Sequence, residues 1–265
     1  LNSLKLRSQL ISYRNQMERW TGKTAVVTGA SSGIGAAVCV ALADAGLKVV
    51  GLARRQERVD ELKSQVSGKG SIVSRKCDVS NIKDIAGTFQ WIDDDLGGID
   101  LLVNNAGVFK QGNITDVNPL LLGWDVVATL DTNVKGIVLC TQLAVASMKR
   151  QKFEGHIINV NSIAGHYIPF SSEFNIYGSS KHAVTAFSAA LANELADYHS
   201  GIKVTSLSPG LVSTEMTVGA SEQVPFKPLQ PKDIADAVLY VVSTPAHVNV
   251  SITEITVQPV AEKRL

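Results

Sequence analysis

Apolar runs typical of buried β-strands alternate along the chain with segments in which apolar residues recur every three or four positions. This alternation predicts a parallel sheet covered by helices on both faces. The seven expected strands are Thr24–Thr28, Lys48–Leu52, Ser71–Lys76, Leu101–Val103, His156–Asn161, Lys203–Ser208 and Glu254–Val257. The expected helices are Ile34–Ala45, Gln56–Val66, Ile82–Leu96, Asp131–Lys149, Ile176–Tyr198 and Lys232–Val242. Right-handed crossovers then predict a doubly wound α/β sheet that binds its ligand beyond the carboxyl ends of the strands.

One stretch, Leu211–Pro231, interrupts this regularity and contains Pro225, Pro228 and Pro231. Irregular connections of about twenty residues are uncommon inside a compact domain and are more often functional than idle. We therefore expect residues 211–231 to form a loop that covers the substrate.

The chain has 265 residues, 45% of them apolar, which is enough for one large core, so residues 17–265 are expected to form a single domain. Residues 1–16 mix basic side chains with scattered leucines, and Met17 lies shortly before the first strand. We expect Met17 to be the natural start, with residues 1–16 a leader or a vector-derived extension.

The overall charge and the cysteines narrow the classes of partner. A formal net charge of +1 gives no general field for nucleic acid or an anionic membrane, and no apolar run is long enough to span a bilayer. Cys39, Cys77 and Cys140 are widely spaced and form no Cys-x-x-Cys pair, as is typical of a reducing compartment. We expect a cytoplasmic protein.

The first strand is followed by a glycine-rich turn, Thr28–Gly35. Gly29 permits a tight turn, while Gly33 and Gly35 let the backbone and the next helix approach a pyrophosphate at the helix N-terminus. Glycines alone also suit a turn that binds nothing, but a strand before and a helix after favour a dinucleotide, as in Rossmann-like folds. The cofactor contacts expected in this turn are Gly29, Ser31, Ser32, Gly33, Ile34 and Gly35.

The residues after the second strand indicate which dinucleotide is preferred. An acidic residue there would bind the adenosine ribose, but the chain has Ala53 followed by Arg54 and Arg55. Because a guanidinium can hold a phosphate through two hydrogen bonds, we infer NADP over NAD, with Ser31 as a hydroxyl partner. The alternative is that both arginines are ordinary surface residues.

Tyr177 and Lys181 lie four residues apart on a predicted helix, with Ser162 fifteen residues before Tyr177. A nearby ammonium favours the phenolate and lowers the pKa of tyrosine, which suits Tyr177 to proton transfer. Ser162 is placed to hold a substrate oxygen, and Asn133 to position a helix and a relaying water. Taken singly, these residues would be ordinary surface or loop side chains; their order after the glycine turn favours catalysis.

These motifs together resemble the short-chain dehydrogenase/reductase family from Lys23 to about Val257. Thr28–Gly35 resembles the family's glycine motif, Asn104–Gly107 its Asn-Asn-Ala-Gly motif, and Tyr177 with Lys181 its Tyr-x-x-x-Lys pair. The resemblance implies that Asn133, Ser162, Tyr177 and Lys181 are catalytic. It also implies further cofactor contacts from Asp78, Val79, Asn105, Ala106, Gly107, Tyr177, Lys181, Pro209, Gly210, Val212 and Thr214.

A narrower resemblance concerns the cytosolic NADP-dependent subgroup that contains insect farnesol dehydrogenases and vertebrate dehydrogenase/reductase member eleven. The segments that resemble it are Met17–Trp20, Val50–Arg55, Gly155–Ser162 and Ser243–Val248. The resemblance implies alcohols or ketones of isoprenoid or steroid type, and a homodimer or homotetramer. The spacing of fifteen between Ser162 and Tyr177 is longer than the thirteen commonest in the family.

An apolar wall follows Ser162 and predicts an apolar alcohol or carbonyl substrate. Part of this wall is also suited to the core. The substrate contacts expected are Ser162, Ile163, Ile168, Phe174, Tyr177 and Met216, with Phe170 and Val212 beside them. The five histidines have no metal-ligand spacing, and we expect no metal.

The sequence thus predicts an NADP(H)-dependent oxidoreductase that interconverts an apolar alcohol, such as farnesol or a steroid-like alcohol, and its aldehyde or ketone. Tyr177 is the expected general acid and base. The alternatives are a catalytically silent NADP-binding regulator or scaffold, and an epimerase or lyase that recycles its cofactor.

Overall fold

A computed structural model describes residues 17–115, 123–168, 174–198, 200–245 and 254–262. Residues 1–16, with the expectation attached to them, and Phe170 lie outside this part of the chain. The described residues form one parallel sheet of seven strands in the order β3-β2-β1-β4-β5-β6-β7. The strands are β1 Thr24–Thr28, β2 Lys48–Ala53, β3 Ser71–Lys76, β4 Leu101–Asn104, β5 His156–Val160, β6 Lys203–Pro209 and β7 Ile255–Val257. The predicted doubly wound fold is confirmed.

The strand order reverses direction at β1. From β1 the chain runs outward through β2 to β3, and it then returns to pair β4 with β1 on the opposite side. In sheets of this kind the crossover segments diverge above the two central strands and leave a crevice at their carboxyl ends. The turn after Thr28 and the turn after Asn104 both open into this crevice.

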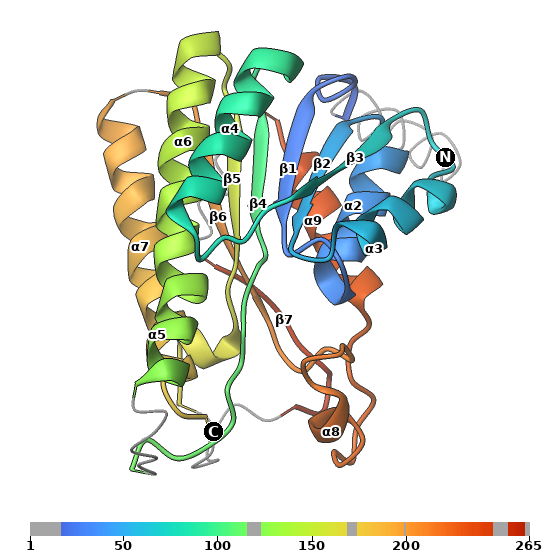
Figure 1. The fold of residues 1–265 in the computed structure, drawn as a ribbon. Helices are drawn as coiled ribbons and strands as arrows, with labels where there is room; N and C mark the ends of the chain where they lie inside the picture. Colours follow the sequence, from blue (N-terminus) through green and yellow to red (C-terminus); the bar gives the residue numbers. More distant parts are fainter. Residues whose placement is uncertain (1–16, 116–122, 169–173, 199, 246–253, 263–265) are drawn as a thin grey trace, which may run out of the picture.

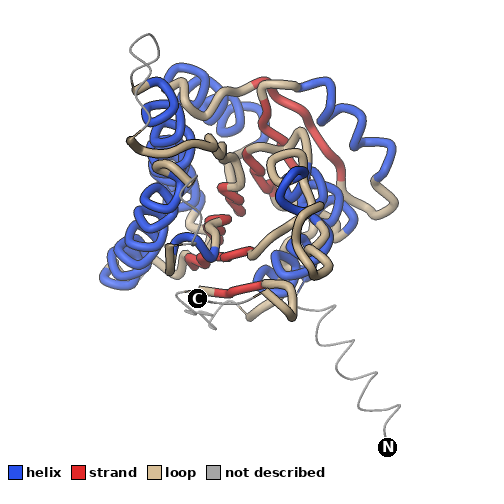
Figure 2. The backbone as a smooth tube through the Cα atoms, turned by 90° about the horizontal axis from the view of Figure 1, so that it is seen from below, coloured by secondary structure: helices blue, strands red, loops and turns tan. Residues whose placement is uncertain are grey.

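Helices cover both faces of the sheet (Figure 1). Helices α2 Gly33–Asp44 and α9 Pro231–Val242 pack on one face, with α3 Gln56–Glu61 and the 3₁₀ turn η1 Leu62–Gln65 beside them. Helices α4 Ile82–Leu96, α6 Ile137–Gln151 and α7 Tyr177–Asp197 pack on the other face. Seen from below, the strands lie between these two groups of helices (Figure 2).

Each face of the sheet has its own apolar core, as a parallel sheet requires. Val27 and Leu101 point into the core under α2 and α9, whereas Val26 and Leu102 point into the core under α4, α6 and α7. Trp20 belongs to the first core, and its indole Nε1 donates to Val242 O at 2.9 Å.

Two predicted helices differ from the structure. Gln56–Val66 divides into α3 and η1. The helix expected at Asp131–Lys149 is preceded by α5 Trp124–Leu130 and begins as a π-helix, η2 Asp131–Gly136. Trp124 and Val127 of α5 are exposed, so this helix lacks the buried apolar stripe by which helices are predicted.

The predicted loop Leu211–Pro231 is largely irregular, as expected, and contains the short helix α8 Val218–Ser221. The 3₁₀ turn η3 Ile163–Gly165 follows β5. Within the described ranges, no helix is both long and apolar enough to cross a membrane. In the same part of the chain, no three His, Cys, Asp or Glu side chains are grouped so as to hold a metal ion.

Candidate active site

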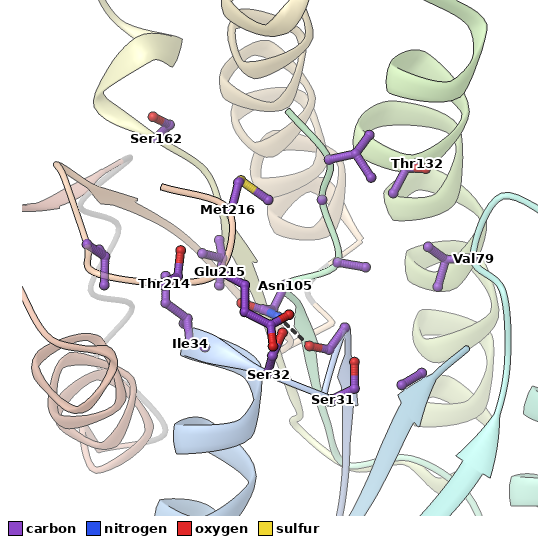
Figure 3. Close-up of a pocket in the computed structure, with 18 of the residues that line it drawn as sticks. Ser31, Ser32, Ile34, Val79, Asn105, Thr132, Ser162, Thr214, Glu215 and Met216 are labelled. Atoms are coloured by element: carbon purple, nitrogen blue, oxygen red, sulfur yellow. Dashed lines mark hydrogen bonds between the residues drawn. The ribbon is translucent and has the colours of Figure 1, made fainter. Parts of the chain in front are cut away.

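A pocket lies at the carboxyl ends of the central strands, where the strand order reverses (Figure 3). It brings together residues from the glycine turn, the ends of β2 to β6 and the loop after β6. The predicted cofactor contacts that line it are Gly29, Ser31, Ser32, Gly33, Ile34, Arg54, Arg55, Asp78, Val79, Asn105, Ala106, Gly107, Tyr177, Lys181, Pro209, Gly210, Val212 and Thr214. Gly35, the remaining predicted contact, is buried behind the turn.

The glycine turn fits a dinucleotide because two of its positions have no room for a side chain. Gly29 has φ +68°, and a Cβ there would lie 2.8 Å from Ala106 Cα. A Cβ on Gly35 would lie 2.4 Å from Gly29 O, so glycine lets α2 start tightly against β1. Ser32 is the N-cap of α2, but its hydroxyl makes no capping hydrogen bond, so the helix start faces the pocket uncapped. Such a helix start is suited to bind a pyrophosphate.

The turn after β4 is tied to the glycine turn by Asn105. Its Nδ2 donates to Thr28 O at 2.9 Å and Gly29 O at 3.2 Å, while its backbone N–H donates to Thr28 Oγ1 at 3.0 Å. Asp78 also lines the pocket, and its Oδ1 accepts hydrogen bonds from both the backbone N–H and the hydroxyl of Ser80. The hydrogen bonds of Asn105 thus join the end of β4 to the end of β1.

A cationic region forms one end of the pocket. Arg55 Nη2 lies 3.4 Å from Ser31 Oγ and 3.5 Å from Ser32 Oγ, so the arginine faces the glycine turn. The same nitrogen also donates to Glu215 Oε2 at 3.1 Å. Arg54 lines the pocket as well, with an exposed side chain. Glu215 was not predicted, because its partner is 160 residues away in the sequence.

Tyr177 opens α7 at the far end of the pocket, where Ser162 also lies. Burial raises the pKa of Tyr177 above its ordinary value of 10.0, and a hydrogen bond with the Ser162 side chain lowers it in part. Ser162 Oγ also accepts from Ala164 N at 3.1 Å, which fixes the hydroxyl at the start of η3. The structure therefore brings together the predicted serine and tyrosine.

Lys181 lies one turn further along α7 and is buried. Its Nζ donates to Val160 O at 3.0 Å and lies 5.7 Å from the centre of the Tyr177 ring. Burial lowers the pKa of Lys181 to about 8. We expected the ammonium to lower the pKa of Tyr177; instead burial raises that pKa, and Ser162 is the group that opposes the increase.

Asn133 lies in the π-helix η2 and is fully buried. Its side-chain amide bonds both the backbone N–H and the carbonyl of Val108, and Nδ2 also donates to Ser180 Oγ at 3.1 Å. π-Helical turns are often found at functional sites. Asn133 itself does not line the pocket, but its neighbour Thr132 does. Its contacts fix the pocket wall and the start of α7.

The loop after β6 closes the pocket from the side of β6 and β7. Val212 is buried and forms a bridge with Leu229, and Thr217 Oγ1 bonds Val212 O. Near the C-terminal end of the described chain, the Glu262 carboxylate accepts from Leu211 N at 3.2 Å. The loop is therefore anchored at its start although most of it has no regular structure.

The predicted substrate wall is only partly gathered at this pocket. Met216 lines the pocket with Ser162 and Tyr177, whereas Ile163, Ile168 and Phe174 are absent from the lining. Phe174 packs near Tyr177, with ring centres 6.3 Å apart, and Ile168 is 65% exposed at the surface.

Phe109 completes the aromatic surroundings of Tyr177. Its ring meets the Tyr177 ring edge-on at 5.3 Å and the Phe174 ring at 5.4 Å. Phe109 is not among the residues predicted from the sequence. Its position shortly after the Asn104–Gly107 turn could have indicated it, because residues that follow the central strands lie at the crevice.

The arrangement supplies a helix start and glycine turn for a pyrophosphate and a cationic region at one end. At the other end it supplies a partly buried tyrosine and serine together with a buried lysine. These are the components needed to hold a dinucleotide and to move one proton beside it. All of them lie in one continuous pocket.

Comparison with known proteins gives the same assignment. Residues 23–225 match the family model described as short chain dehydrogenase. The chain is 49% identical over 251 residues to a farnesol dehydrogenase of Aedes aegypti, with 93% of this chain and all of that protein covered. It is 38% identical over 250 residues to human dehydrogenase/reductase SDR family member 11, covering 89% of this chain and 95% of that one.

Solved structures agree with this comparison. A metagenomic short-chain oxidoreductase in complex with NADP superposes with a TM-score of 0.75 at 30% identity, covering 90% of this chain and 98% of that one. The closed form of a serine dehydrogenase complexed with NADP+ gives 0.78 at 31% identity, covering 91% and 96%.

Proposed function

The chain belongs to the short-chain dehydrogenase family, an oxidoreductase family, and on this basis we propose that it is an NADP(H)-dependent enzyme that interconverts an apolar alcohol and its aldehyde or ketone. The observation that carries the proposal is the single pocket in which Tyr177, Ser162 and Lys181 lie at one end and Arg55 and the glycine turn at the other. Neither catalytic residues without a cofactor site nor a cofactor site without catalytic residues would support the proposal.

NADP is proposed over NAD because of the charges at the adenosine end. Arg55 faces Ser31 and Ser32, and Ala53 stands where an acidic residue would bind the ribose of NAD. Two solved relatives contain NADP. Substituting Arg54 by Asp, with Arg55 left intact, tests whether Arg54 contributes to this preference. An unchanged preference for NADP over NAD would show that Arg54 does not bind the phosphate.

The proposed chemistry assigns one task to each catalytic side chain. The bound nicotinamide supplies or accepts the hydride. In oxidation Tyr177 removes the hydroxyl proton of the alcohol, and in reduction it returns that proton to the carbonyl oxygen. Ser162 holds the substrate oxygen beside Tyr177, since its hydroxyl already bonds the phenol. Lys181, with a pKa of about 8, keeps a positive charge near the tyrosine at neutral pH.

The apolar surroundings of Tyr177 support the substrate class. Phe109 and Phe174 pack around the tyrosine, and Met216 lines the pocket. An isoprenoid or steroid-like alcohol fits such a wall, and the farnesol dehydrogenase of Aedes aegypti is similar over nearly the whole chain. The test follows nicotinamide absorbance with farnesol, other terpenoid alcohols, steroid alcohols and matched small polar alcohols. Turnover confined to the polar alcohols would contradict this substrate class.

The alternative is an NADP-binding regulator without catalysis. It would be favoured if the protein bound NADPH but turned over none of these compounds in either direction.

We also propose a homodimer or homotetramer. Exposed apolar side chains on α5 and α6, including Trp124, Val127 and Leu143, support such an assembly. Light scattering of the purified protein tests it, and a monomer would exclude it.

A further inference from the structure

Glu215, on the loop of residues 211–231 (the substrate loop), places its carboxylate at the cationic end of the pocket. Glu215 Oε2 lies 3.1 Å from Arg55 Nη2, and Glu215 Oε1 lies 2.5 Å from Arg58 Nη1. Arg55 follows β2 and Arg58 belongs to α3, whereas Glu215 lies on the loop after β6. The ion pairs therefore connect two segments that border the pocket from different strands.

The contact is centred on the guanidinium that faces the glycine turn. Arg55 Nη2 lies 3.4 Å from Ser31 Oγ, 3.5 Å from Ser32 Oγ and 3.1 Å from Glu215 Oε2. Figure 3 shows Glu215 near Ser31 and Ser32, at the end of the pocket away from Ser162. The two arginines lower the pKa of Glu215, Arg58 more than Arg55, so the carboxylate is negatively charged at neutral pH.

A carboxylate and a phosphate monoester compete for the same donors. Both accept paired hydrogen bonds from a guanidinium, and a phosphate monoester carries nearly two negative charges at neutral pH. A phosphate that approached Arg55 would have to displace Glu215 or lie beside it against like-charge repulsion. NAD lacks this phosphate and leaves the ion pairs intact.

We propose that Glu215 is a specificity-determining residue that competes with the 2′-phosphate of NADP(H) for Arg55. The inference rests on the proposed preference for NADP. It predicts that the carboxylate weakens binding of the phosphorylated cofactor selectively, and that entry of the 2′-phosphate releases Glu215, and with it the start of the substrate loop, from Arg55.

The test uses two adenosine fragments, 2′,5′-ADP and 5′-AMP, which differ by the 2′-phosphate alone and need no catalysis. Calorimetry compares the wild type with Glu215→Gln and with the matched control Glu222→Gln. Glu222 is an exposed carboxylate on the same loop that makes no ion pair with either arginine among the described contacts. Thermal denaturation checks that all three proteins are folded.

We expect Glu215→Gln to bind 2′,5′-ADP about three- to tenfold more tightly at low ionic strength, with a smaller gain at high salt. Binding of 5′-AMP should stay unchanged, and Glu222→Gln should behave as the wild type. An equal gain for both fragments, an equal gain in the control, or no gain would overturn the inference.

The same data separate this inference from the cofactor assignment. If wild-type protein binds 2′,5′-ADP no better than 5′-AMP, the NADP preference itself is wrong, whatever the variant does. If the wild type prefers 2′,5′-ADP and Glu215→Gln leaves that preference unchanged, the competitor role alone is wrong.

Discussion

The side chain of Asn133 and the backbone of Val108 are joined by two hydrogen bonds. Val108 N donates to Asn133 Oδ1 at 2.8 Å, and Asn133 Nδ2 donates to Val108 O at 3.0 Å. Nδ2 also donates to Ser180 Oγ, which in turn donates to Tyr177 O at 2.7 Å. Asn133 thus links the segment after β4 to the first turn of α7, where Tyr177 lies.

Asn133→Ala should therefore weaken both stability and catalysis. It leaves the partly buried Val108 N–H and carbonyl without these partners, which costs about 1–3 kcal/mol of unfolding free energy. Loss of the link to Ser180 should also lower kcat. Urea denaturation and steady-state kinetics measure the two effects. The control is Asn159→Ala, which removes another buried amide that does not line the pocket. Its Nδ2 donates to Ser188 Oγ at 2.9 Å and its Oδ1 accepts from Asn104 Nδ2 at 2.9 Å. An equal loss of kcat in both variants would indicate general destabilisation only.

Arg55→Gln should reduce the preference for NADP over NAD by about 10- to 100-fold, because a hydrogen-bonded charge at the phosphate is lost. Affinity for NADH should change little. Fluorescence titration with NADPH and NADH measures the ratio. Arg75→Gln is a suitable control for net charge, because Arg75 stacks on Trp91 instead of facing the pocket. A preserved ratio in Arg55→Gln would remove this arginine from phosphate binding.

The pH dependence of the reaction should have opposite signs in its two directions. Burial raises the pKa of Tyr177, so the phenol keeps its proton at neutral pH. Alcohol oxidation, which needs the deprotonated form, should accelerate as the pH rises, whereas carbonyl reduction should slow.

Ser162→Ala gives a sharper form of this prediction. Its hydroxyl lowers the pKa of Tyr177, so the variant should need a higher pH to reach the same fraction of its maximal oxidation rate. Measuring kcat/KM against pH in both directions tests this. A variant profile shifted to lower pH would contradict the assigned role of Ser162.

His156 should make the protein less stable in acid. Burial, with Lys203 and Arg19 nearby, lowers the pKa of His156 well below its ordinary value of 6.5. Between these two pKa values the unfolded chain binds a proton that the folded chain does not, so unfolding becomes easier as pH falls below 6.5. Above that range this histidine contributes no pH dependence.

His156→Gln should therefore lose less stability than the wild type between about pH 7.5 and about pH 5.5. Glutamine can still reach Thr205 Oγ1, which lies 2.8 Å from His156 Nε2. Urea denaturation at both pH values gives the comparison. An equal loss in the two proteins would exclude His156 as a source of acid sensitivity.

The parts of the structure that depend on short sequence patterns were predictable. All seven strands, the glycine turn and the placement of Tyr177 with Lys181 on one helix follow from apolar spacing and local motifs. The end of β2 could also be located, which placed Arg54 and Arg55 at the pocket.

Contacts between distant segments could not be predicted. Glu215 reaches Arg55 across 160 residues, and Phe109 reaches Tyr177 only because β4 and α7 end at the same crevice. Apolar periodicity does not predict the π-helix η2, because its residues depart from the ordinary helical repeat. The predicted lowering of the Tyr177 pKa is wrong. Burial, which is a property of the folded chain, raises this pKa more than the hydrogen bond with Ser162 lowers it.

Substitution of Tyr177 by Phe tests whether the Tyr177 hydroxyl is the general acid and base. The ring and its packing against Phe109 are kept, while the group that moves the proton is removed. We expect wild-type protein to oxidise farnesol or a related apolar alcohol with NADP, and Tyr177→Phe to lose at least about 100-fold in kcat. NADPH affinity, measured by fluorescence, should stay close to that of the wild type. Full activity in Tyr177→Phe would exclude Tyr177 as the general acid and base.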